Sequence, residues 1–174
     1  MDEERFQIGS GLIAFAIVFA IVMPACKSSD GSVQELTLAE QRILAAANDF
    51  ARGDATSWKA LASHADDVSL FGGGGGQAKG WSVVGDRYTW AASAFSGGSV
   101  TASPVTRFVD RNLAVSVSVE QWDVKFTKTD QPAILKLRVT HVFRREGNVW
   151  RLAHRHADPL TTTHEIDSVV HLNQ

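Results

Sequence analysis

The sequence predicts an α+β fold in which helices come first and a run of antiparallel strands follows. In the first half of the chain, apolar residues recur at steps of three and four, which indicates amphipathic helices. After the segment "SGGS" at residues 96–99 the period changes, and apolar residues alternate with polar ones as in strands. Helices followed by consecutive strands are typical of α+β domains whose helices pack on one face of the sheet.

The bulk composition narrows the class of protein. With 174 residues, of which 44% are hydrophobic and 21% charged, the chain has an ordinary globular composition. The formal net charge of −2 provides no basic field for a nucleic-acid backbone, so nucleic acid is not an expected partner. Cys26 is the only cysteine, which excludes an intrachain disulfide and cysteine-based metal or thiol chemistry in the domain.

The N-terminal segment is typical of an export signal. Residues 12–23 are almost wholly apolar, and the "MPAC" at residues 23–26 resembles the lipobox of bacterial lipoproteins. The resemblance implies cleavage before Cys26 and lipid attachment to it. An uncleaved anchor over residues 8–25, an ordinary secretory signal and a misplaced start remain alternative interpretations. We therefore expect residues 1–26 to be a signal peptide or membrane anchor, and the protein to lie in the cell envelope or to be secreted.

Three helices are expected in the first half of the domain. The first follows a polar tether at residues 27–35, because Thr37 and Glu40 fit a capping box and Gly53 fits a C-terminal stop. A shorter helix is expected in "TSWKALASHA" and a third in "WSVVGDRYTWAASAF".

The glycine run at residues 72–76 is not a phosphate-binding loop. Such a loop ends in Gly-Lys-Ser/Thr, whereas Ala78 precedes Lys79 here and Gly80 follows it. No Gly-x-Gly-x-x-Gly pattern fits residues 72–80 either. The run is predicted to be a turn between a strand in "DDVSLFG" and the third helix, with a moving loop at a pocket rim as the alternative.

Four strands are expected in the second half of the chain. The alternation of apolar and polar residues is clearest in the strand expected at residues 112–127. Leu113, Val115, Val117 and Val119 alternate there with small or polar residues. Because few charges fall in this strand, the outer face of the sheet is a candidate dimer surface. The expected strands are residues 99–110, 112–127, 133–146 and 149–158.

The candidate chemistry lies in the last strand. In "WRLAHRHADPL", His154, His156 and Asp158 occupy alternate positions and so share one face of the strand. A histidine and a carboxylate would suit acid–base work, with Glu120 as a further carboxylate. A metal site would need a third ligand such as Asp158 or His141, and we predict no metal. The alternative is that these side chains line a pocket and hydrogen-bond to neighbouring strands.

A ligand pocket is also suggested by the five tryptophans, because small-ligand sites are commonly lined with aromatic rings. Trp58, Trp90 and Trp122 are the candidates, with Arg138 and His141 as polar members of the same pocket. The paired carboxylates at residues 66–67 are adjacent in a short strand or turn. They point to opposite faces and are predicted to have a turn role.

Three segments together resemble the SnoaL-like branch of the nuclear-transport-factor-like, or ketosteroid-isomerase-like, superfamily. They are "WKALASHADDVSL", "GGQAKGW" and "LRVTHVFRREGNVWRLAHRHADPL". The resemblance implies that residues 36–160 form a cone, in which about three N-terminal helices pack on a curved, mainly antiparallel sheet, with residues 161–174 as a tail. It implies a pocket at the open end for a small, largely apolar molecule, no cofactor, and a homodimer through the sheet.

Ketosteroid isomerase chemistry is not expected. Alignment on "ADD" at residues 65–67 places the general base of that isomerase at Gly72, and its tyrosine falls near Ala46. The only tyrosine, Tyr88, lies elsewhere.

Three functional hypotheses therefore remain, because a fold does not by itself fix a function. The first is an exported, membrane-tethered domain that binds a small apolar molecule, with no catalysis assigned. The second is a lyase-, cyclase- or isomerase-type enzyme in which His154 or His156 acts with Asp158 or Glu120. The third is a self-associating module without a ligand, which is favoured by a similarity of the last hairpin to the association domain of calcium/calmodulin-dependent kinases.

Overall fold

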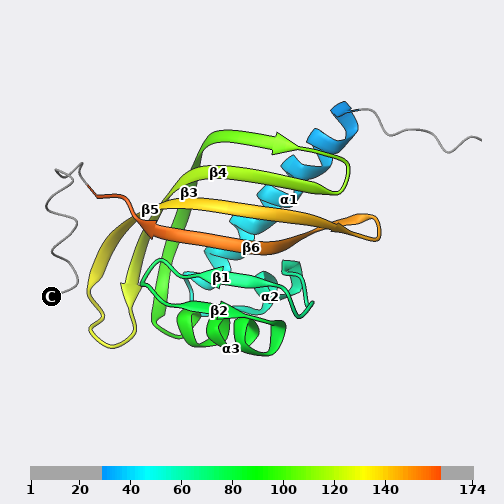
Figure 1. Ribbon diagram of the computed structural model, residues 1–174. Helices are drawn as coiled ribbons and strands as arrows, with labels where there is room; N and C mark the ends of the chain where they lie inside the picture. Colours follow the sequence, from blue (N-terminus) through cyan, green and yellow to red (C-terminus); the bar gives the residue numbers. More distant parts are fainter. Residues whose placement is uncertain (1–28, 162–174) are drawn as a thin grey trace, which may run out of the picture.

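The computed structural model describes residues 29–161, which form helices packed on one mixed sheet (Figure 1). The sheet has six strands in the order β2-β1-β6-β5-β4-β3, and all neighbours are antiparallel except β1 and β6. The α+β prediction is confirmed. The elements are α1 (Ser29–Phe50), α2 (Thr56–Leu61), β1 (Ser69–Phe71), β2 (Gln77–Lys79), α3 (Trp81–Ala92), β3 (Phe95–Val109), β4 (Leu113–Phe126), β5 (Pro132–Glu146) and β6 (Val149–Pro159).

The long strands curve, and the curvature makes the cone that the family resemblance implied. Figure 1 shows β3, β4 and β5 bending along their length, with α1 behind the sheet and α3 beside the short strands β1 and β2. The pairing of β3 with β4 shifts register between Pro104 and Thr106, and such bulges increase local bend and twist. The helices cover the concave side, and we call the opposite side of the sheet the outer face.

The start of α1 and the glycine segment differ from the sequence prediction. α1 begins at Ser29, so most of the expected tether is helical, and the Thr37 hydroxyl donates to the carbonyl of Val33 inside the helix. Leu36 is fully buried, and this packing extends the helix beyond the predicted cap. The segment after the glycines forms the strand β2 before α3 begins, because Gln77–Lys79 pairs with β1.

An apolar core holds the helices against the sheet, and polar contacts of α1 with β3 add to it. The largest fully buried side chains include Trp58, Phe143 and Leu152. Asn48 of α1 donates to the carbonyl oxygen of Val100 at 3.2 Å and accepts from its amide at 2.9 Å. These two bonds attach α1 directly to the backbone of β3.

The regular apolar alternation of β4 faces outward. Ala114, Ser116 and Glu120 are buried on the helical side, whereas Val115 and Val117 are only half-buried on the outer face. Neighbouring positions on the outer face include Phe108 and Leu113, with 63% and 50% of their surface exposed. The outer face is thus partly apolar, and homodimerisation through it stays a prediction.

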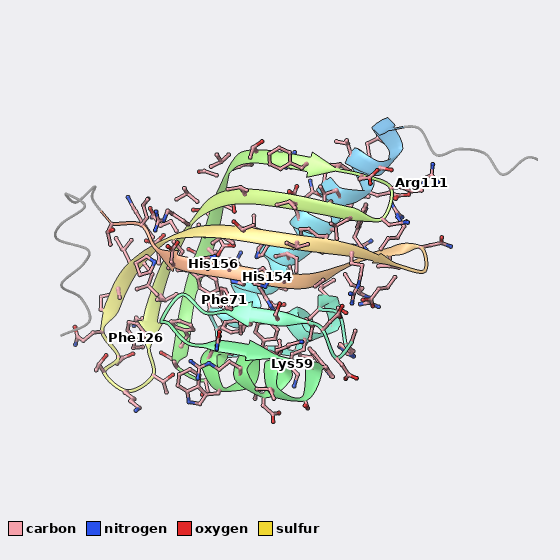
Figure 2. All side chains as sticks on the ribbon, in the orientation of Figure 1. Lys59, Phe71, Arg111, Phe126, His154 and His156 are labelled. Carbon is pink, nitrogen blue, oxygen red and sulfur yellow. The ribbon has the colours of Figure 1, made fainter. Side chains whose placement is uncertain are left out.

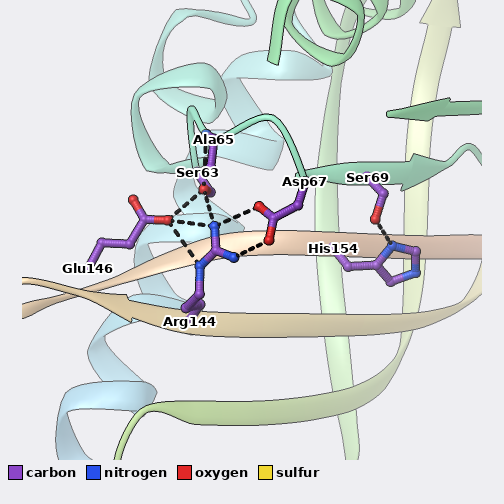
Figure 3. A network of polar contacts seen from close by, with 7 residues as sticks. All are labelled: Ser63, Ala65, Asp67, Ser69, Arg144, Glu146 and His154. Atoms are coloured by element: carbon purple, nitrogen blue, oxygen red, sulfur yellow. Dashed lines mark hydrogen bonds and ion pairs between the residues drawn. The ribbon is translucent and has the colours of Figure 1, made fainter. Parts of the chain in front are cut away.

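A polar network fastens the loop between α2 and β1 to the sheet (Figure 3). Arg144 of β5 donates to both carboxylate oxygens of Asp67, at 2.6 and 3.0 Å, and to the hydroxyl of Ser63 at 2.9 Å. Its Nη2 also donates to Glu146 at 3.0 Å. The Arg144 hydrogen bonds lower the pKa of Asp67. Asp67 therefore has the turn role expected for it.

The N-terminal predictions fall outside these residues. Cys26 and the rest of the expected signal or anchor precede Ser29, and most of the expected tail follows residue 161. Within residues 29–161, none of the helices combines the length and the apolar character needed to cross a membrane.

Candidate functional site

A β-bulge in the last strand decides which side chains enter the cone. β5 and β6 shift register so that Val142 pairs with His154 and Phe143 pairs with Leu152, which leaves Ala153 unpaired. A bulge adds one residue and reverses the alternation of side chains that follow it. Trp150 and Leu152 before the bulge are buried on the helical side.

After the bulge, Arg155 and Ala157 take the buried positions. His154, His156 and Asp158 share one face as predicted, but that face is the outer one. The expectation that they line the cavity is therefore wrong, and the cause is the extra residue at Ala153.

The outer-face histidines form a small cluster with β1 (Figure 2). The ring of Phe71 stands edge-on to both His154 and His156, with centroids 5.3 Å apart in each case. The hydroxyl of Ser69 lies 2.9 Å from Nδ1 of His154. Partial burial, and then the neighbouring His156, lower the pKa of His154.

Asp158 and Arg138 pair with each other instead of reaching the histidines or the cavity. They are cross-strand neighbours on the outer face, and the guanidinium of Arg138 donates to both oxygens of Asp158. The side chain of Arg138 is 62% exposed. The prediction that Arg138 belongs to the pocket is wrong, because its position in β5 alternates with the inward-facing Leu137.

Inside the cone, Arg155, Glu120, His141 and Trp122 form what we call the buried polar cluster. Nη1 and Nη2 of Arg155 donate to the two oxygens of Glu120, at 3.0 and 2.8 Å. Nε1 of Trp122 donates to Oε2 of Glu120 at 2.9 Å. Nη1 of Arg155 also lies 2.6 Å from Nε2 of His141, which accepts if that imidazole is neutral.

The protonation states of this cluster follow from burial and charge. Burial opposes ionisation of Glu120, but the charge and hydrogen bonds of Arg155 outweigh it and lower the pKa of Glu120 to about 2. Burial, reinforced by the charge of Arg155, lowers the pKa of His141 to about 3. Glu120 is therefore an ionised counter-ion, and His141 is a neutral acceptor at physiological pH.

Arg155 also lines a cavity of about 590 Å³, which lies between the helices and the concave side of the sheet. This volume is in the range of small-molecule sites. The wall is mostly aromatic and aliphatic, and the glycine loop at residues 72–75, of which Gly74 and Gly75 are exposed, lies along it. Among the described residues, its lining contains no histidine and no carboxylate. The aromatic members are Phe50, Trp58, Tyr88, Trp90, Phe95, Trp122 and Phe126.

The structure places three of the candidate pocket residues in the cavity wall. Trp58, Trp90 and Trp122 all line the cavity. His141 contacts Arg155 within the buried polar cluster and does not itself line the cavity. Glu120 is likewise held by Arg155 and Trp122, so the expected pairing of Glu120 with His154 or His156 is absent from the described residues.

Sequence reasoning missed Arg155, Arg87 and Tyr88. Arg155 stands between the two histidines, and only the unforeseen bulge turns it inward. Tyr88 is the only tyrosine, and its position four residues after Val84 and three after Gly85, on the buried face of α3, was the available signal. Burial raises the pKa of the Tyr88 phenol, so the group stays protonated and can donate a hydrogen bond.

A metal site does not assemble in the part of the chain that the structure describes. No three histidine, cysteine or carboxylate side chains of residues 29–161 are grouped around one point. His141 faces the core, whereas His154 and His156 lie on the outer face, so the third ligand considered from sequence is on the wrong side of the sheet.

Comparisons with known proteins agree with this architecture. The model of a family described as SnoaL-like domain matches residues 39–161. A nuclear transport factor 2-like superfamily protein from Salmonella enterica aligns with a TM-score of 0.70 at 21% identity, covering 80% of this chain and 99% of that one. The comparison with curated proteins found no match.

Two further solved structures have the same fold. A candidate dehydratase of the NTF2-like family from Streptomyces avermitilis has a TM-score of 0.66 at 21% identity, covering 76% of this chain and 99% of that one. A ketosteroid isomerase-like protein from Erwinia carotovora atroseptica has a TM-score of 0.64 at 16% identity, covering 75% and 98%. At these identities the likeness concerns the fold alone.

The lowered pKa of His141 predicts a pH-dependent stability. The pKa of His141 is about 3 in the folded protein and near 6.5 in the unfolded chain. At a pH between these two values, His141 binds a proton only in the unfolded chain, so lowering the pH favours unfolding. From pH 7 to pH 5, the wild type should lose about 2 kcal/mol more free energy of unfolding than His141→Gln, which keeps an acceptor for Arg155. Urea unfolding at both pH values measures this difference. The exposed His64→Gln serves as control, and an equal pH dependence in wild type and His141→Gln would contradict the assignment.

Proposed function

The chain belongs to the SnoaL-like domain family, and we propose that it binds a small, largely apolar molecule in the cavity of the cone. The observation that carries the proposal is the cavity of about 590 Å³ with its mainly aromatic and aliphatic wall. Burial of apolar ligand surface against such a wall supplies most of the affinity in sites of this kind.

The polar groups of the cavity give the ligand an orientation. Tyr88 contributes a protonated hydroxyl, and Arg155 contributes N–H groups whose charge is balanced by Glu120. In an otherwise apolar site, a small number of polar groups usually fixes the orientation of the ligand. We infer that the bound molecule has at least one oxygen or nitrogen acceptor.

Binding is favoured over the His–carboxylate enzyme that was the alternative. His154, His156 and Asp158 lie on the outer face, and Glu120 accepts three hydrogen bonds from Arg155 and Trp122. A carboxylate with a pKa of about 2 is a weak base, so Glu120 suits a structural role better than proton abstraction.

The apolar N-terminus supports a second part of the proposal, which concerns location. Residues 12–26 combine an apolar run with a final cysteine. We propose that the protein is exported, that Cys26 becomes the lipidated N-terminus, and that the domain is held at a membrane surface.

Blocking the cavity tests the binding proposal. Ala91 lines the cavity from α3, and Ala91→Phe would fill space that the ligand needs. A neutral apolar fluorescent probe, N-phenyl-1-naphthylamine, should bind the wild-type full chain saturably, and Ala91→Phe should weaken binding by about tenfold or more. Val83→Phe, on the exposed face of the same helix, is the matched control and should bind like wild type. Equal binding by all three proteins would place the probe outside the cavity and refute the proposal.

Metabolic labelling tests the proposed tether. Wild-type protein expressed in a bacterium should incorporate labelled palmitate and fractionate with membranes. Cys26→Ser should lose the label, because lipid attachment needs the thiol. Wild-type protein that takes up no label would end the lipoprotein proposal.

A further inference from the structure

Arg87 of α3 lines the cavity, and no residue in the described part of the chain forms an ion pair with it. Its guanidinium carbon lies 4.1 Å from the centre of the Trp90 ring, and Arg87 and Trp90 both line the cavity. Nη2 of Arg87 also lies close to the glycine loop, only 3.2 Å from where a side-chain carbon on Gly76 would stand. The ring and the loop therefore position the guanidinium at the solvent-exposed end of the cavity.

The missing partner distinguishes Arg87 from most arginines of the fold. Within residues 29–161, Arg87 makes neither a hydrogen bond nor an ion pair with the protein. A half-buried guanidinium without an acceptor loses hydration that no protein group replaces. The arginines that do pair with carboxylates are Arg52, Arg107, Arg138, Arg144, Arg145 and Arg155.

The local charge of the cavity is opposite in sign to that of the chain. The chain carries a formal net charge of −2, yet the charged residues of the cavity lining are Arg87, Lys136 and Arg155. The charge of Arg155 is offset by Glu120, and Lys136 is exposed. Arg87 is therefore the partly desolvated cation that a ligand can neutralise.

We propose that the ligand is an apolar organic acid whose carboxylate pairs with Arg87 while its apolar part lies against the aromatic wall. The planar guanidinium matches a carboxylate in a bidentate arrangement, which is stronger than a neutral hydrogen bond. This inference rests on the proposed function, because it names the class of molecule that the same cavity takes.

A matched pair of probes tests the charge. Decanoate and decan-1-ol have the same chain length, and their affinities for the full chain are measured by calorimetry at pH 7 and one ionic strength. The affinity ratio of decanoate to decan-1-ol should fall by about tenfold or more in Arg87→Gln, with the affinity for decan-1-ol nearly unchanged. Arg111→Gln makes the same charge change in the turn between β3 and β4, far from Phe126 at the opposite end (Figure 2), and should keep the wild-type ratio.

The outcomes separate this inference from the proposed function. Saturable binding of decan-1-ol with an unchanged ratio in Arg87→Gln would keep the apolar site and overturn the role of Arg87. An equal fall of the affinity ratio in Arg87→Gln and Arg111→Gln would show that decanoate responds only to the net charge of the protein. That result would also overturn the role of Arg87. Failure of wild-type protein to bind either probe would refute the binding function itself.

Discussion

The ion pair between Arg155 and Glu120 is the contact on which the cavity depends. Both side chains are more than nine-tenths buried, and burial of charges without partners costs several kcal/mol. The pair joins β6 to β4 across β5, and it draws in Trp122 and His141 as further hydrogen-bonding partners. Glu120 balances the charge of Arg155, and Arg155 also lines the cavity, where its N–H groups can donate hydrogen bonds to a ligand.

The bulge at Ala153 is what makes this pair possible. A strict alternation along β6 would place His154 and His156 inside and Arg155 outside. With the extra residue, Arg155 meets Glu120, and the histidines move to the outer face beside Phe71. One inserted residue therefore places Arg155 on the helical side of the sheet and the two histidines next to it in the sequence on the outer face.

The fold was more predictable than the site, because the bulge at Ala153 changes which side chains face the cavity but not where the strands begin and end. The strand limits and the helical face of α1 follow from periodicity, which is local information. The side of the sheet to which a residue belongs depends on a bulge that has no signal in "RLAHRH", so Arg155 was missed and His154 was misplaced. That Arg87 forms no ion pair among residues 29–161 depends on how side chains lie in space, which no spacing along the chain reveals.

A double-mutant cycle on Glu120 and Arg155 tests the central claim most directly. The free energies of unfolding are measured in urea for wild type, Glu120→Gln, Arg155→Met and the double variant. Each single change should cost about 3 to 5 kcal/mol because it leaves one charge buried alone, and the double variant should cost less than the sum by 2 kcal/mol or more. Costs that add within about 0.5 kcal/mol would show that the two side chains act independently, and would contradict the account.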